Sequence, residues 1–186
     1  MMSEKYLKKY YTQFNNLFDD KSYFKKLVII KDKILDVKKK KKKVVIFGNG
    51  GSAAIASHFS VDLTKIAKVR CVNFNEYDLI TCFANDYGYE NWMKMAINFY
   101  LDKGDILILV SSSGSSKNVL KAANFAKKKG IYLITFTGFK KNNPLTKKGK
   151  INIWVNSKVY NHVENIHQIQ LLSIADLLAK TKVFSK

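Results

Sequence analysis

The chain has 186 residues, 47% of them apolar, which is enough for a domain with a core of its own and excludes an intrinsically disordered chain. Thirty-three basic against fourteen acidic residues give a formal net charge of +19, which draws attention to nucleic acids and anionic membranes as partners. No apolar run approaches the ~20 residues of a membrane span and the N-terminus has no signal-peptide core, so we expect a cytoplasmic protein without a membrane partner.

Two helices are predicted at the N-terminal end, over residues 3–36. Apolar residues recur there at three- and four-residue intervals, as they do on one face of a helix: Leu7, Tyr10, Tyr11, Phe14, Leu17, Phe24, Leu27 and Val28. The aromatic residues Tyr10, Tyr11 and Phe14 exceed what a small sheet domain needs to cover itself. We therefore expect a homo-oligomer.

The run from Lys38 to Lys43 is the densest block of charge in the sequence. It directly precedes an apolar, strand-like segment, so we interpret it as a solvated loop between a helix and a sheet. Arg70 is the only arginine, and lysine lacks the planar fork that reads guanine or clamps a phosphate. We therefore expect no nucleic-acid partner. The hypothesis of a DNA-binding protein rests on charge alone. It can be tested by whether the lysines gather on one face of the protein or scatter over its surface.

Short apolar stretches alternate with helical patterns through the rest of the chain. Strands are predicted at residues 44–47, 69–74, 105–110, 131–136 and 151–155, and helices after the first strand, at 117–129 and at 161–182. This order predicts an α/β fold with a parallel sheet covered by helices on both faces, in which ligands bind at the carboxyl ends of the strands. We expect one domain over 1–186, with helices in 1–37 and the α/β core in 44–186. Cys71 and Cys82 are expected to be reduced thiols.

Two loops rich in glycine and serine stand where a strand gives way to a helix: Gly48-Asn49-Gly50-Gly51-Ser52 and Ser111-Ser112-Ser113-Gly114-Ser115-Ser116. Their N–H groups and hydroxyls converge on the positive end of a helix dipole, which predicts a phosphate site. The first loop also fits the loose dinucleotide pattern G-x-G-x-x-A, but no acidic residue follows about twenty positions later to bind a ribose. A purely structural role as turns is the competing interpretation.

Five motifs together resemble the sugar isomerase (SIS) domain family, and within it the phosphoheptose isomerases. They are the two loops, His58-Phe59 with Asp62-Leu63-Thr64, Asn85-Asp86-Tyr87-Gly88-Tyr89, and Asn118-Val119, in the family's order from about Val44 to the C-terminus. The resemblance implies a flavodoxin-like SIS fold with a five-stranded sheet and a homo-oligomer, typically a tetramer, with sites between subunits. It also implies a zinc ion and conversion of sedoheptulose 7-phosphate to heptose 7-phosphate for surface-polysaccharide synthesis.

Carried over position by position, the resemblance assigns residues of this chain to three roles. Substrate binding falls to Asn49, Gly50, Gly51, Ser52, Asp86, Ser111, Ser112, Ser113 and Ser116, with the phosphate held by the serines and the sugar contacted by Asn49 and Asp86. Metal binding falls to His58, Asp62 and Glu164. His58 and Asp62 are four residues apart, which places both on one face of a helix.

This chain departs from the family's pattern at the positions of its catalytic and metal-binding residues. The family's catalytic glutamate is Asp62 here, and its glutamine ligand is Glu164. Its catalytic histidine falls at Leu172, which can neither transfer a proton nor bind a metal. His167, three residues after Glu164, is the candidate replacement. The segment between Thr64 and Asn85 is short for the family, so residues of that loop are not transferred.

Two functions are compared with these residues: an isomerase and a non-catalytic binding module. An aldose–ketose isomerase needs a base that moves a proton between neighbouring carbons and an acid or metal that stabilises the enediol oxygens. Asp62 is the expected base and His167 the expected second catalytic residue. The alternative is a binding module that keeps the fold without the catalytic set, as some SIS proteins that act through protein partners do. Leu172 favours that alternative, whereas the intact loops and His58 favour the enzyme.

Overall fold

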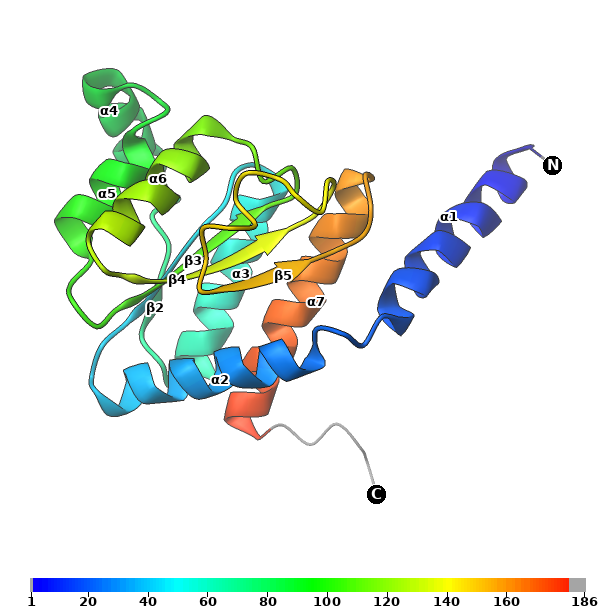
Figure 1. Cartoon of the computed structure of the whole chain (residues 1–186), viewed down its shortest axis with the longest axis horizontal. Helices are drawn as coiled ribbons and strands as arrows, with labels where there is room; N and C mark the ends of the chain where they lie inside the picture. The colour runs from blue at the N-terminus through cyan, green and yellow to red at the C-terminus, as the bar shows by residue number, and fades with distance from the viewer. Residues whose placement is uncertain (1, 181–186) are drawn as a thin grey trace.

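Five short strands form one parallel sheet at the centre of the molecule, shown in Figure 1. The computed structural model describes residues 2–180. The sheet has the order β2-β1-β3-β4-β5, and its strands are β1 (Val44–Phe47), β2 (Cys71–Val72), β3 (Ile106–Ser111), β4 (Tyr132–Thr137) and β5 (Ile151–Trp154). Every strand pair is parallel, so all carboxyl ends of the strands lie at one edge. This confirms the expected five-stranded parallel α/β sheet.

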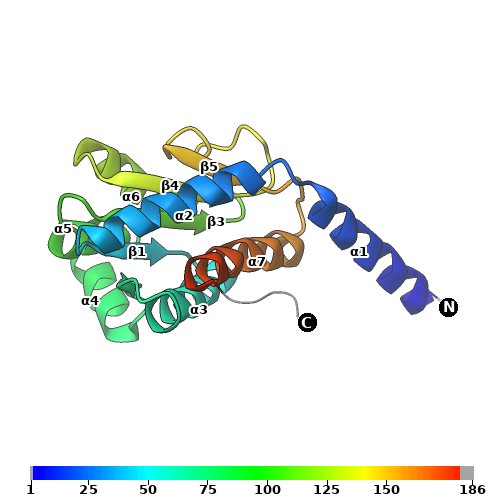
Figure 2. The same ribbon diagram turned by 90° about the horizontal axis from the view of Figure 1, so that it is seen from below.

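Helices cover both faces of the sheet (Figures 1 and 2). One face carries α2 (Phe24–Lys39), α3 (Gly51–Lys65) and α7 (Tyr160–Ala179), and the other carries α4 (Tyr77–Tyr87), α5 (Trp92–Tyr100) and α6 (Lys117–Lys128). Alternation along β1 explains the two layers, because Val44 and Ile46 pack toward α2, α3 and α7, whereas Val45 and Phe47 pack toward α5 and α6. All four side chains are fully buried.

Helix α1 (Met2–Asp19) projects from the body of the protein (Figure 2), and none of its residues is buried. Phe14 packs beside the first turn of α7, and the ring of Tyr10 lies 4.2 Å from the imidazole of His162, centre to centre. Tyr11 is exposed, as are Tyr6 and Leu7. Two of the three aromatic residues that we had assigned to a subunit interface therefore contact α7 of the same chain.

The structure differs from the predicted elements mainly between β1 and β3. The strand predicted at 69–74 pairs only at Cys71 and Val72, because the amide side chains of Asn73 and Asn75 bond to α3 instead, at Ser60 Oγ (2.8 Å) and Ala53 O (2.9 Å). Two helices not predicted there, α4 and α5, follow β2. The last helix begins at Tyr160, and positions 181–182 of its predicted span lie outside the described residues.

Two further features are the polarity of the helices and the state of the two cysteines. Between residues 2 and 180, none of the helices is long and apolar enough to cross a membrane. Cys71 and Cys82 are both free thiols, the first buried and the second exposed. The prediction of reduced thiols is therefore confirmed.

Candidate functional site

A polar pocket of about 270 Å³ lies at the carboxyl edge of the sheet, between β1 and β3. The two loops that follow these strands meet there, and α7 closes one side. The lining residues are Asn49, Gly50, Gly51, Ser52, Val110, Ser111, Ser112, Ser113, Ser116, Tyr160 and Glu164. The structure thus gathers eight of the nine expected substrate-binding residues at the N-termini of α3 and α6, where helix dipoles favour an anion.

The glycines of the first loop are required by backbone geometry and by close packing. Gly50 has a φ of +53°, in the left-handed region, and it immediately precedes α3. A Cβ atom on Gly51 would lie 2.3 Å from Oε2 of Glu164, so only glycine leaves room for this carboxylate. The loop therefore brings the first turn of α3 against α7.

The serine loop presents hydroxyls that its own backbone does not fully use. Ser111 Oγ accepts a hydrogen bond from the N–H of Gly114 at 3.2 Å, and Ser113 Oγ accepts one from the N–H of Ser115 at 3.3 Å. Ser116 precedes α6 but its hydroxyl makes no capping bond. The hydroxyl of Ser112 is buried and has no partner among the described residues. An unpaired buried hydroxyl is costly, so Ser112 is suited to a bound anion.

An amide pair holds the two loops in register. Asn49 and Asn118 exchange two side-chain hydrogen bonds, of 3.0 and 2.8 Å. Asn118 also accepts a bond from the N–H of Val119 at 3.0 Å, and the hydroxyl of Tyr89 donates to Asn49 Oδ1 at 3.3 Å. The motif around Tyr89 is thereby tied to the first loop.

We predict that Ser112→Ala weakens the binding of a sugar phosphate by about 10- to 100-fold, the value of one charge-assisted hydrogen bond. Because this hydroxyl is unpaired in the free protein, the variant should be no less stable than wild type. Ser115→Ala is the matched control, since Ser115 is exposed and absent from the lining. Calorimetry with a sugar phosphate measures both affinities, and equal losses in the two variants would contradict the assignment.

Glu164 is the only carboxylate in the pocket lining. Its partial removal from water raises the pKa of its carboxyl above the ordinary value. A carboxylate beside a phosphate cradle is repelled by the dianion, whereas it accepts hydrogen bonds from sugar hydroxyls. Glu164 is therefore suited to contact hydroxyl groups rather than a phosphate.

His58 and Asp62 form a pair on α3, with His58 Nε2 3.4 Å from Asp62 Oδ2. The other ring nitrogen, Nδ1, lies 3.2 Å from Nε2 of Gln168 on α7. If the amide donates to Nδ1, the ring proton resides on Nε2 and points toward Asp62. Gln168 thus orients the imidazole, and the imidazole orients the carboxylate.

The expected metal ligands are not gathered into one shell. Catalytic zinc sites normally have three protein ligands and one open position. Among residues 2–180, no three His, Cys, Asp or Glu side chains lie close enough together to hold a metal ion. His58 contacts Asp62, whereas Glu164 lies against Gly51. With these side-chain rotamers, His58, Asp62 and Glu164 therefore do not form one zinc shell.

Two other expected site residues lie elsewhere. Asp86 is exposed on α4, where its carboxylate contacts Cys82 and Asn85, and it is not part of the pocket lining. His167 faces the core: it is fully buried, its Nε2 lies 3.1 Å from the carbonyl oxygen of Thr137, and its ring packs on Phe136. A position three residues after Glu164 shares its face only partly, and here that rotation turns the imidazole inward, so His167 cannot take the catalytic role we assigned to it.

Burial lowers the pKa of the His167 imidazole to about 4. In the unfolded chain the same group titrates near ~6.5, so the unfolded state binds more protons between these values and stability falls as the pH falls through this window. We predict a loss of about 3 kcal/mol between pH 7 and pH 4 from this residue. Urea unfolding of His167→Gln should lack that part of the wild-type acid sensitivity, and identical pH profiles would refute the prediction.

Two residues of the site were not among those expected from the sequence. Tyr160 lines the pocket from the first turn of α7, and Gln168 contacts His58. Gln168 lies four residues after Glu164, so helical periodicity places both on one face of α7. That spacing was the available signal.

Comparisons with known proteins give a consistent result. A family model described as "SIS domain" matches residues 9–138. The phosphoheptose isomerase of Colwellia psychrerythraea is 32% identical over 141 residues, which cover 72% of this chain and 72% of the relative. That of Helicobacter pylori is 40% identical over 96 residues, and that of Cytophaga hutchinsonii 36% over 95 residues. Each of these two alignments covers 48% of this chain and 50% of the relative. In these alignments the chain thus spans about half the length of either relative.

Solved structures agree over nearly the whole chain. The phosphoheptose isomerase of Neisseria gonorrhoeae has a TM-score of 0.87 at 21% identity, covering 96% of this chain and 99% of that one. The phosphoheptose isomerase of Francisella tularensis has a TM-score of 0.86 at 19% identity, covering 97% and 100%. At these identities the likeness establishes the fold, and it confirms the expected SIS architecture.

Proposed function

Because this chain belongs to the SIS domain family, we propose that it is a phosphosugar aldose–ketose isomerase that converts sedoheptulose 7-phosphate to heptose 7-phosphate. The observation that carries the proposal is the meeting of two glycine- and serine-rich loops in one pocket at two helix N-termini. The relatives named phosphoheptose isomerase supply the substrate class of this proposal. In this proposal the product serves surface-polysaccharide synthesis in the cytoplasm.

The phosphate binds the serine hydroxyls and the free N–H groups at the start of α3 and α6. The sugar then extends along the neighbouring faces of α3 and α7. From Ser52 to His58 the helix rises by about 9 Å, a length comparable to that of an extended seven-carbon sugar phosphate. This geometry supports reaction at the carbons farthest from the phosphate, beside the His58–Asp62 pair.

Asp62 acts as the base in this proposal. It removes a proton from the hydroxyl-bearing carbon next to the carbonyl, which gives an enediolate, and returns it to the former carbonyl carbon, while the hydroxyl proton passes from one oxygen of the enediolate to the other. His58 holds the carboxylate in place through the contact at 3.4 Å, and Glu164 accepts hydrogen bonds from sugar hydroxyls nearer the phosphate. His167 takes no part, because it is buried in the core.

Zinc binding by His58, Asp62 and Glu164 stays a proposal from the resemblance. Glu164 lies one helical turn from Gln168, the residue that contacts His58, so a change of its side-chain rotamer would be needed to complete the shell. Calorimetric titration with zinc tests this. We expect His58→Ala to abolish binding, and equal binding by wild type and variant would reject the site.

The activity itself is tested by incubating the purified protein with sedoheptulose 7-phosphate and following the aldose product by NMR. Parallel samples contain other ketose phosphates and added divalent ions. New aldose signals in the sample with sedoheptulose 7-phosphate, and in none of the samples with other ketose phosphates, support the substrate assignment. Absence of turnover with every substrate, with sugar-phosphate binding retained, would overturn the isomerase proposal.

That last outcome is the one expected of the second candidate, a phosphosugar-binding module without catalysis. The observation that favours it is the lack of an accessible histidine on α7: Leu172 occupies the family's position, and both His162 and His167 are buried. Binding with an intact pocket but no turnover would identify this function.

We also propose that the chain forms a homotetramer. Exposed apolar side chains on α1, at Tyr6, Leu7 and Tyr11, support an interface there, and so does the position of Asp86 outside the pocket of its own chain. Light scattering at micromolar concentration tests the state. A monomer would remove this support for sites shared between subunits.

A further inference from the structure

The lysines are concentrated at the edge of the sheet opposite the pocket. In a parallel sheet, the segments that lead into the strands all lie at the edge formed by the strands' amino ends. Here these segments are residues 38–43, 66–70, 101–105, 127–131 and 147–150. They hold fifteen of the thirty-three basic residues within twenty-five positions: Lys38, Lys39, Lys40, Lys41, Lys42, Lys43, Lys68, Arg70, Lys103, Lys127, Lys128, Lys129, Lys147, Lys148 and Lys150. We refer to this set as the basic edge.

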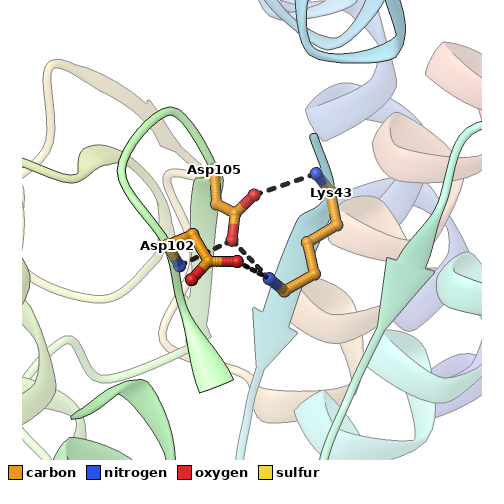
Figure 3. A network of polar contacts seen from close by, with 3 residues as sticks. All are labelled: Lys43, Asp102 and Asp105. Carbon is orange, nitrogen blue, oxygen red and sulfur yellow. Dashed lines mark hydrogen bonds and ion pairs between the residues drawn. The ribbon is translucent and has the colours of Figure 1, made fainter. Parts of the chain in front are cut away.

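The two acidic residues within these segments, Asp102 and Asp105, both contact Lys43, as Figure 3 shows. Nζ of Lys43 lies 2.6 Å from Asp105 Oδ2 and 3.1 Å from Asp102 Oδ2. The buried carboxylate of Asp105 also accepts hydrogen bonds from the N–H groups of Lys43 (3.0 Å) and Asp102 (2.8 Å). Two carboxylates offset only two of the fifteen cations, so the basic edge keeps a large positive charge.

Helix electrostatics explains only a part of this pattern. Lys38 and Lys39 occupy the last turn of α2, and Lys127 and Lys128 the last turn of α6, where cations favour the helix dipole. The lysines at 40–43, 103 and 147–150 lie outside any helix. Among these, Lys43 holds Asp102 and Asp105 and Lys148 contacts Asn124, whereas helix electrostatics does not account for the others.

The shape of the basic edge suits a linear polyanion. Neighbouring strands are about 4.8 Å apart, so the five segments form a row about 19 Å long. At the β4–β5 end, Lys127, Lys147, Lys148 and Lys150 line a hollow of about 460 Å³. Clustered lysine ammonium groups attract the phosphates of a nucleic-acid backbone.

We propose that the basic edge binds nucleic acid through its phosphates, without sequence preference. Fourteen of the fifteen cations of the basic edge are lysines, point charges that attract phosphates without the planar fork with which arginine reads guanine. A membrane surface fits less well, because Ile66 is the one exposed large apolar side chain within these five fully described segments. Fifteen of the thirty-three basic residues gather on one edge, and on this ground the proposal departs from our expectation from the sequence that nucleic acid is no partner.

The test compares two variants with the same change in net charge. Lys127→Glu/Lys147→Glu/Lys150→Glu alters exposed residues of the hollow, and Lys5→Glu/Lys8→Glu/Lys9→Glu alters exposed residues of α1. Fluorescence anisotropy with labelled oligo(dT), from about 50 to 200 mM salt, measures the affinity and its salt dependence. We expect the first variant to bind about tenfold more weakly or worse, with a salt slope smaller by about 2, and the second to keep the wild-type slope.

Several results would overturn the proposal. One is equal weakening in both variants, which would make net charge the cause. Another is the absence of wild-type binding at physiological salt. A third is tighter binding to vesicles of anionic lipid than to the oligonucleotide, and a fourth is full competition by polyglutamate, which would point to an acidic protein. Sugar-phosphate binding at the opposite edge should be unchanged in the first variant, and this measurement verifies that it is folded.

Discussion

Replacing Asp62 by asparagine should lower kcat by about 10²- to 10⁴-fold, the usual contribution of a positioned general base. Asparagine keeps the shape of the side chain and the contact with His58, but it cannot accept a proton. Asp62 does not line the phosphate pocket, so the affinity for sedoheptulose 7-phosphate should stay near the wild-type value. Steady-state kinetics and calorimetry on the same preparation separate the two effects.

Asp62→Glu is the matched control for this prediction. It keeps the carboxylate and restores the length of the family's residue, so turnover should be retained or increased. A displacement of about 1 Å at a reacting group can cost ~100-fold, so the shorter side chain of Asp62 leaves room for such a gain. If Asp62→Asn keeps kcat within about tenfold of wild type, the base is another group. Glu164, the carboxylate of the pocket, is then the next residue to substitute.

The sequence was sufficient to predict the pocket between β1 and β3, because each loop that forms the pocket is adjacent in sequence to its strand. Each loop follows a strand directly, and a parallel sheet places the ends of β1 and β3 side by side, with Val44 opposite Ile106 and Phe47 opposite Leu109. Adjacent strands and short loops leave little freedom in where the hydroxyls lie. The gathering of Asn49 to Ser52 with Ser111 to Ser116 follows from topology alone.

The sequence was not sufficient where a side chain's role depends on the rotation of a helix or on another segment. His167 and Glu164 are three residues apart, yet one is buried against Phe136 and the other lines the pocket. Asp86 belongs to a helix that we did not predict, although Leu79, Ile80 and Phe83 recur there at helical spacing. The inward rotation of His167 and the helix that carries Asp86 both depend on tertiary packing, which a short motif does not encode.

The histidine that the family carries at position 172 is the residue whose return should have the largest positive effect. Contacts of Gly51 with Glu164 and of His58 with Gln168 show that α3 and α7 run in the same direction. One turn beyond Gln168 is Leu172, and one turn beyond His58 is Asp62, so a side chain at 172 lies next to Asp62. We expect Leu172→His to raise kcat by about 10²-fold, because it adds a proton-transfer group at that point.

Leu172→Gln serves as the control for size and polarity, because glutamine fills the same half-buried position without exchanging a proton. Its kcat should stay at the wild-type value. A pH–rate profile adds a readout that packing alone would not move: Leu172→His should gain a limb near the histidine pKa of ~6.5, and Leu172→Gln should not. An unchanged kcat in Leu172→His, with the protein folded and the sugar phosphate bound, would mean that α7 does not face the reacting carbons. The binding-module function would then be favoured over the isomerase.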